Sequence, residues 1–144
     1  MILRKTQEQQ YFQSIGGVYL GMSTDDLTAL YGSPSSVDNS NAMQGKIIWK
    51  YENEGFDVQI IGGNIVSRIT VYSYGNRRFD RSGLSCDSSL EEFCSFYQVK
   101  NAEFVEKSVG RSSSETTSIG HGERISFLNY PESLTLTTSR HSSL

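Results

Sequence analysis

The sequence predicts an α+β fold in which two tandem repeats, each a helix followed by a β-meander, form one antiparallel sheet with the helices on one face. Two observations indicate it. One short pattern occurs twice along the chain, and within each copy the hydrophobic period changes from about 3.6 residues to 2. We expect a single domain over residues 1–144, with the first repeat at 11–74 and the second at 83–140.

The repetition lies in the apolar positions of the two copies. At an offset of 66 residues, the aligned helical positions are Leu27, Leu30 and Tyr31 with Phe93, Phe96 and Tyr97. At an offset of 76 residues, the aligned hairpin positions are Trp49, Tyr51, Val58 and Ile60 with Ile125, Phe127, Leu134 and Leu136. Self-similarity of this kind is typical of a duplicated supersecondary unit.

The composition argues against several classes of protein. A chain of 144 residues suits one compact domain with a sizeable core. Its net charge of -3 argues against a nucleic-acid partner. The one local basic cluster, Arg77, Arg78 and Arg81, is interpreted as a solvated linker, with docking to an acidic partner as the alternative. No window approaches the ~20 apolar residues that cross a bilayer, so we expect no integral membrane segment and no signal peptide in this chain.

In the first copy, capping signals mark a short helix. Ser23 has the position of an N-cap, and Asp25 and Asp26 follow where negative charge meets the positive end of the helix dipole. Gly32 and Pro34 end this helix. An earlier short helix, ending at Gly16-Gly17, is expected within residues 6–15, and residues 35–45 are interpreted as a loop. The helix after Ser23 is therefore short and one-sided, and we expect it to cover one face of the sheet that follows.

Alternating apolar residues then predict a three-stranded meander. Ile47, Trp49 and Tyr51 share one face of the first strand, and Val58 and Ile60 share one face of the second. Turns are expected at 53–55 and 62–64. In the third strand, Ile65, Ser67, Ile69 and Val71 alternate with the opposite set, which is Val66, Arg68, Thr70 and Tyr72.

The second copy repeats this order less clearly. Ser89 and Glu92 have the spacing of a capping box before a helical stripe that contains Leu90, Phe93, Cys94 and Tyr97. Residues 98–124 carry no clear pattern beyond an extra strand expected at Phe104-Val105. A hairpin follows at 125–127 and 134–136. We expect the third strand of this copy to be missing or displaced.

These motifs resemble a known repeat. Gly21 to Ser23 introduces the helix, Gly32 to Pro34 closes it, and Trp49 and Tyr51 form a Trp-x-Tyr strand. In this order they are similar to the repeat of the BamE outer-membrane assembly lipoproteins and the beta-lactamase inhibitor proteins. The resemblance covers residues 15–74 well and 83–138 loosely. It implies tandem helix-plus-sheet repeats in a protein that binds another protein, in the periplasm or outside the cell.

Cys86 and Cys94 leave three alternatives open. A disulfide between them needs Cα atoms within ~7 Å. Both thiols could instead be buried and inert. A nucleophilic thiolate would need a base such as His121 and a lowered pKa, and Cys86 lies just before a helix, where the dipole favours a thiolate.

Other reactive residues give no catalytic pattern. His121 and His141 are too few and too isolated for a metal site, so we expect no metal. Asp25-Asp26 and Glu91-Glu92 occupy first helical turns, where capping and the helix dipole already explain them. No nucleophile-elbow, zinc-protease or Cys-x-x-Cys motif is present. We expect no cofactor and no enzyme activity.

Aromatic residues suggest a recognition surface. The chain has 8 Tyr, and Tyr72 lies on the side of its strand opposite Ile69 and Val71. Arg68 shares that side, and Tyr74 is expected to continue it. Tyr and Arg are enriched at protein interfaces. We expect Arg68, Tyr72 and Tyr74 to bind another protein; the alternatives are a cysteine enzyme using Cys86 or Cys94 and a self-associating structural envelope protein.

Overall fold

The structure is a computed structural model, and it describes residues 13–75, 77–97, 116–120, 123–126, 130 and 132–138. Its helices are α2 (Thr24–Tyr31), η1 (Ala42–Gln44), η2 (Ser73–Gly75) and α3 (Leu90–Tyr97), where η1 and η2 are short 3-10 helices. Its strands are β1 (Ser14–Ile15), β2 (Val18–Tyr19), β3 (Ser36–Asp38), β4 (Lys46–Tyr51), β5 (Phe56–Ile61), β6 (Ile65–Tyr72), β7 (Thr116–Gly120), β8 (Glu123–Ser126) and β9 (Ser133–Thr138).

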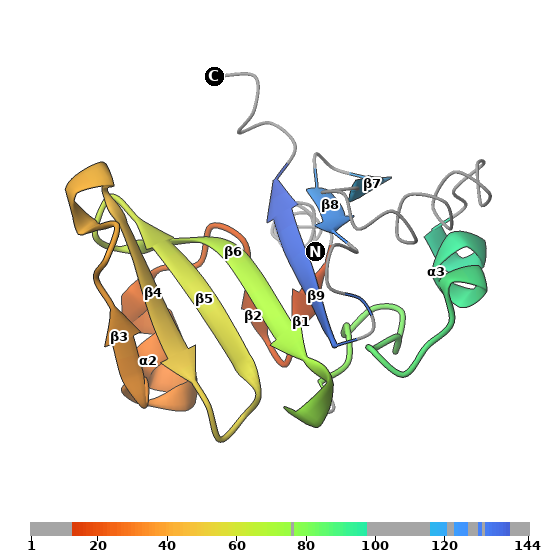
Figure 1. Ribbon diagram of the computed structural model, residues 1–144, viewed down its shortest axis with the longest axis horizontal. Coiled ribbons are helices and arrows are strands. Elements are labelled where there is room, and N and C mark those ends of the chain that lie inside the picture. The colour runs from red at the N-terminus through yellow and green to blue at the C-terminus, as the bar shows by residue number, and fades with distance from the viewer. Residues whose placement is uncertain are drawn as a thin grey trace, which may run out of the picture.

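Seven strands form one sheet in the order β3-β4-β5-β6-β9-β8-β7, and every neighbouring pair is antiparallel. The strands β1 and β2 make a separate small hairpin (Figure 1). The α+β class and a large antiparallel sheet are therefore confirmed, although β1 and β2 form a second sheet of their own. The meander predicted from alternation is β4, β5 and β6, whereas β3 and η1 form within the segment interpreted as a loop.

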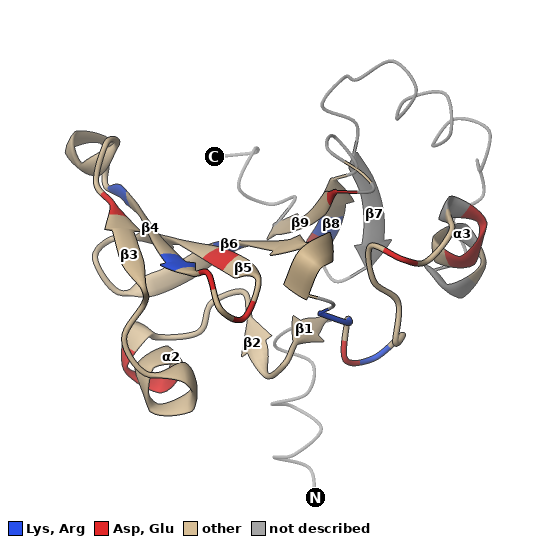
Figure 2. Cartoon of the chain, turned by 60° about the horizontal axis from the view of Figure 1, so that its bottom comes forward, with Lys and Arg blue, Asp and Glu red and all other residues tan. Residues whose placement is uncertain are grey.

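The helix α2 and the β1–β2 hairpin lie on the same face of the sheet, under β3 to β6, as the view from the side makes clear (Figure 2). Ser23 caps α2 as predicted, because its hydroxyl accepts a hydrogen bond of 3.1 Å from the backbone N–H of Asp26. Leu27 is fully buried against the sheet. Backbone hydrogen bonds from Gly21 to Val66 and from Val66 to Met22 fasten the start of the helix to β6.

An aromatic cluster fills the space between α2 and the sheet. The rings of Tyr51 and Phe56 stack at 4.9 Å, and Tyr31 from α2 meets Phe56 edge-on at 5.1 Å. Arg77 covers this cluster, with its guanidinium carbon 5.1 Å from the ring centre of Tyr31. The interpretation of Arg77 as a solvated side chain is therefore wrong, since an arginine stacked on rings contributes to packing as well as charge. Arg78 and Arg81 are exposed, as expected.

The alternation predicted for β6 fails at its start. Val66 is 1% exposed and faces the core, although the pattern placed it with Arg68 on the opposite side. The register between β5 and β6 shifts between Gln59 and Ile60, so β6 contains a bulge at Ser67. A bulge adds one residue to a strand and reverses the alternation beyond it. Val66 and Ile69 are therefore both buried, three residues apart.

The N-terminal segment differs from the prediction. Ser14–Ile15 form a strand and not the end of a helix; the rest of that expected helix lies outside the described residues. Gly16 and Gly17 make the tight turn to β2 with φ of 59° and 88°, values that glycine adopts without steric cost. The Asp80 carboxylate accepts hydrogen bonds from both of their backbone N–H groups, each 3.0 Å long, and one from the Ser14 hydroxyl.

The helix of the second half forms as its signals predict. Its capping box is complete: the backbone N–H of Ser89 donates to the Glu92 carboxylate at 2.8 Å, and the backbone N–H of Glu92 donates to the Ser89 hydroxyl at 3.1 Å. However, α3 lies beyond the β7–β8 end of the sheet and not beneath its face as α2 does (Figures 1 and 2). Its buried Phe93 packs edge-on against Phe79, with ring centres 6.1 Å apart.

The tandem repeat is not confirmed. The offset of 76 residues aligns β4 with β8 and β5 with β9, yet β9 is the last strand of its meander and pairs with β6, the last strand of the other. The strand that completes the second meander is β7, which precedes the predicted hairpin instead of following it. The strand expected at Phe104-Val105 lies outside the described residues. The division into repeats at 11–74 and 83–140 stays a prediction.

Candidate functional site

The face of the sheet opposite α2 is lined by rows of polar side chains. Directly paired residues share a face, so the register places Ile48, Gln59 and Arg68 in one row across β4, β5 and β6. The neighbouring row consists of Lys50, Asp57, Thr70 and Thr135. We call this surface the open face, because neither α2 nor the β1–β2 hairpin lies on it.

Arg68 is held in place by its neighbour on β5. One of its terminal nitrogens, Nη2, donates a hydrogen bond to Oε1 of Gln59. The Gln59 amide is fixed in turn, because its Nε2 donates to the Ser67 hydroxyl at 3.0 Å. The same hydroxyl donates to the backbone carbonyl of Gln59 at 3.1 Å. The bulge at Ser67 therefore orients Gln59, and Gln59 orients the exposed arginine.

Tyr72 and Asp57 form the second polar pair of the open face. The Tyr72 hydroxyl donates a hydrogen bond of 2.7 Å to the Asp57 carboxylate. Burial raises the pKa of Asp57, and the hydrogen bond from Tyr72 opposes part of that rise. Burial and the bond to Asp57 both raise the pKa of the Tyr72 phenol. The pair therefore combines a proton that stays on Tyr72 with a carboxylate that is only partly solvated.

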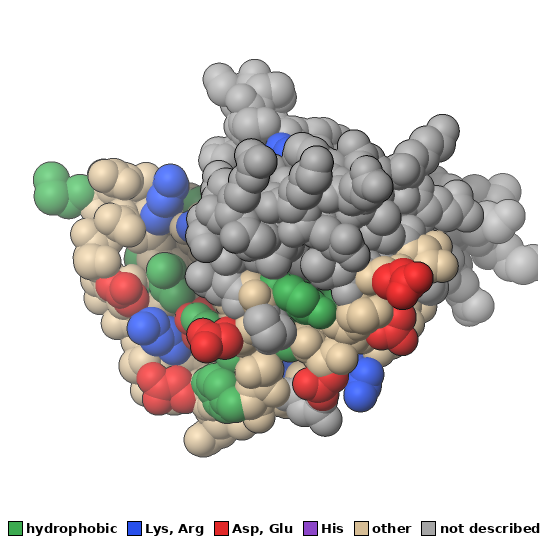
Figure 3. All heavy atoms as spheres, turned by 45° about the vertical axis from the view of Figure 1, so that its right-hand side comes forward, with side chains coloured by type: hydrophobic (Ala, Val, Ile, Leu, Met, Phe, Trp, Pro, Cys, Tyr) green, Lys and Arg blue, Asp and Glu red, His purple; other side chains and the backbone are tan. Residues whose placement is uncertain are grey.

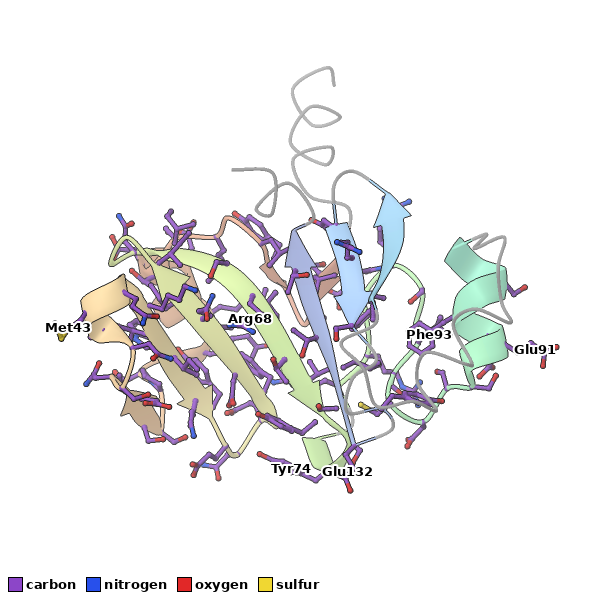
Figure 4. All side chains as sticks on the ribbon, turned by 45° about the horizontal axis from the view of Figure 1, so that its top comes forward. Met43, Arg68, Tyr74, Glu91, Phe93 and Glu132 are labelled. Carbon is purple, nitrogen blue, oxygen red and sulfur yellow. The ribbon has the colours of Figure 1, made fainter. Side chains whose placement is uncertain are left out.

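Tyr74 extends this pair toward solvent. It lies in η2 and does not continue β6 as expected, but its ring stacks on that of Tyr72 at 5.8 Å. Its hydroxyl donates to the backbone carbonyl of Glu52 at 3.1 Å, and 67% of the residue remains exposed. Figure 4 shows Arg68 in the middle of the sheet and Tyr74 at one end of β6, near Glu132. The exposed ring is thus held at both its face and its hydroxyl.

A hollow of about 160 Å³ lies between these groups, and its lining consists of Ile48, Asp57, Val58, Gln59, Arg68, Thr70 and Tyr72. A guanidinium, a carboxylate, two hydroxyls and an amide converge there on a small apolar floor. The Thr70 hydroxyl is hydrogen-bonded to that of Thr135 on β9 at 3.1 Å, which fixes its orientation. Such an arrangement recognises polar groups by hydrogen bonding and charge.

The structure brings the predicted site residues together. Arg68 and Tyr72 line the same hollow, and Tyr74 stacks beside it. Sequence reasoning missed Asp57 and Gln59, which complete the polar lining. The signal was available, because these two residues alternate with the buried Phe56, Val58 and Ile60 along β5. Their pairing with Arg68 and Tyr72 depends on the register across the β5–β6 hairpin.

Cys86 lacks the character of a nucleophile. It is a free thiol that is only 6% exposed, so of the three alternatives the disulfide is not formed in this structure; the side chain of Cys94 lies outside the described residues. Its sulfur donates to the backbone carbonyl of Val71 at 3.7 Å. Burial, with a smaller effect of the nearby Asp87, raises the pKa of Cys86 to about 11. At neutral pH the thiol stays protonated.

The remaining candidates give no site. Asp25, Asp26, Glu91 and Glu92 are exposed in the first turns of α2 and α3. Within the described ranges, no three His, Cys, Asp or Glu side chains gather closely enough to hold a metal ion. His121 and His141 lie outside those ranges. No helix in the described part of the chain is long and apolar enough to span a bilayer.

Comparisons with known proteins give no relative. No protein-family model matches the chain. Searches of curated proteins and of solved structures likewise find no significant match. The resemblance to the BamE and beta-lactamase inhibitor repeat therefore rests on the sequence motifs alone.

Proposed function

We propose that this chain is a non-catalytic protein-binding module of the cell envelope or the secreted space, and that its open face contacts another protein. The observation that carries the proposal is Tyr74, a ring that is 67% exposed and yet fixed by stacking on Tyr72 and by its bond to Glu52. A preordered aromatic side chain loses little conformational entropy on binding. Tyr and Arg are also the residues most often found at the energetic centres of interfaces.

The polar side chains that line the hollow beside Tyr74 support the same role. Arg68, Gln59 and Tyr72 are held by hydrogen bonds within the chain, so a partner would meet groups that are already oriented. The resemblance to the BamE and inhibitor repeat points to a protein partner in the envelope or outside the cell. The alternative of a cysteine enzyme finds no support at Cys86, whose thiol is buried and protonated at neutral pH.

Site-specific photocrosslinking in the native cell tests the proposal. A benzoylphenylalanine at position 74 should give one discrete adduct with another protein, because Tyr74 is exposed and stacks on Tyr72 of the open face. The matched control is Met43, which is fully exposed at the far end of the sheet in Figure 4 and should give none. Arg68→Ala should reduce the adduct at least about five-fold, as expected for an interface residue worth 1 kcal/mol or more.

Two outcomes contradict the proposal. Equal crosslinking from positions 43 and 74 would mean that the open face has no preference for a partner. An adduct between two copies of this chain, together with a dimer mass in light scattering, would instead support the self-associating structural protein.

A further inference from the structure

We infer that the partner is an acidic protein segment, whose carboxylates bind a pair of arginines on the open face, Arg68 and Arg124. This inference rests on the proposed function and adds the chemistry of the partner. Its first support is the strand register, which aligns Arg68 on β6 with Arg124 on β8, in the second half of the chain.

The register places both arginines on the same face. Arg68 on β6 pairs with Thr137 on β9, and Thr137 pairs with Arg124 on β8. Residues directly opposite one another in a sheet project to the same side. The two arginines are therefore separated by two strand spacings, about 10 Å. Figure 2 shows basic positions on β4, β6 and β8, so the cations cross the sheet from one half to the other.

Neither arginine is neutralised within the described part of the chain. The one hydrogen bond of the Arg68 guanidinium goes to the neutral amide of Gln59, which leaves its remaining N–H groups available. Arg124 has no carboxylate partner among the described residues. A guanidinium binds a carboxylate through two parallel hydrogen bonds, the strongest pairing it makes with a protein side chain. With respect to the described residues, the two side chains thus offer two sites for a carboxylate.

The acid nearest to Arg68 in the hollow is already engaged. Asp57 accepts the hydrogen bond of Tyr72 and lies in the field of Lys50, its direct neighbour on β4. The residue between the two arginines, Thr137, is uncharged. A partner carboxylate therefore meets little competition at either arginine.

The distribution of charge favours protein over nucleic acid. The chain carries a net charge of -3, and charges of both signs are interspersed on the side drawn in Figure 3. Asp57 would repel a continuous row of phosphates laid along the open face, whereas separated carboxylates can avoid it. Nucleic-acid surfaces usually show a dense basic stripe. A peptide with spaced Glu or Asp residues fits this surface better.

A peptide titration tests the inference directly. The probe is a fluorescent ten-residue peptide of alternating Glu and Thr, measured by anisotropy at low salt against the same peptide with Gln in place of Glu. Arg68→Gln and Arg124→Gln should each weaken binding of the Glu peptide about two- to five-fold, the size expected for an exposed ion pair. The two effects should multiply in the double variant, because the sites are about 10 Å apart. Urea denaturation verifies that each variant is folded.

Arg78→Gln is the matched control, since Arg78 is also exposed and its loss changes the net charge equally. This variant should bind the Glu peptide as the parent does. Equal weakening by Arg78→Gln, equal binding of the Gln peptide, or tighter binding of a ten-residue oligothymidylate would overturn the inference. A crosslink from position 74 that Arg68→Ala reduces but Arg124→Gln leaves at full strength would also overturn it, while leaving the proposed function intact.

Discussion

The two halves of this molecule contain the same local signals but dock their helices differently. In the first half, α2 is capped by Ser23 and lies beneath the sheet, with Leu27 buried and Tyr31 packed on Phe56. In the second half, α3 is capped by Ser89 yet lies past the end of the sheet, where Phe93 packs on Phe79. Capping and amphipathicity therefore determine that a helix forms, and the surface within reach determines where it packs.

The difference also explains why the face opposite α2, the proposed binding surface, is polar. The first half covers one face of β4 to β6 with apolar and aromatic groups, so the polar residues of these strands project to the other side. The pairing of β6 with β9 extends that polar surface into the second half. A binding surface built on paired strands is held more rigidly than one built on loops.

The largest expected effect tests the docking of α2. Leu27→Ala should lower the free energy of unfolding by about 3 kcal/mol, because it leaves a cavity under the sheet. Urea denaturation measures the change. Leu30→Ala is the control on the same helix; Leu30 is 50% exposed, and its loss should cost less than about 1 kcal/mol. Equal costs for the two variants would show that α2 is not anchored as described.

A smaller effect compares the two caps. Ser23→Ala and Ser89→Ala should each cost about 1 kcal/mol, since each removes the acceptor of an N-terminal backbone N–H. Hydrogen exchange should locate the loss in α2 for the first variant and in α3 for the second. Asp restores an N-cap acceptor, so Ser23→Asp and Ser89→Asp should recover most of the stability, while Ser95→Ala within α3 should change little. If Ser89→Ala lowered the hydrogen-exchange protection of α2 as well, the conclusion that the two helices pack independently would be wrong.

The smallest effect is confined to alkaline pH. It concerns the Cys86 thiol, which precedes α3 and donates a hydrogen bond to the Val71 carbonyl of β6. The fold raises the pKa of Cys86 from 9.0 to about 11, so above pH 9 the unfolded chain loses this proton before the folded chain does. The associated stability is complete below pH 9 and disappears as the pH rises through 11. Cys86→Ala should lack this part of the decline in unfolding free energy between pH 9 and 11. Any change in stability that the variant already shows at pH 7 is subtracted first. Parallel stability curves from pH 7 to 11 would show that the thiol is not buried as described.

The amino-acid sequence by itself determined the features that depend on neighbours a few residues apart. The caps at Ser23 and Ser89, the turn at 62–64 and the buried side of β5 all follow from short-range hydrogen bonding and period. These interactions form within one turn or one strand, so the residues that make them stand close together in the chain.

Only the tertiary structure decided the features that join distant segments. The bulge at Ser67 reversed the pattern of β6, β9 paired with β6, and Asp80 came to hold the turn at 16–17. Each depends on strand registers and contacts between residues far apart in the sequence. Bringing such residues together costs chain entropy, which is offset only when the whole sheet assembles. The polar hollow beside Arg68 belongs to this class, because Gln59 and Asp57 reach it across the β5–β6 register.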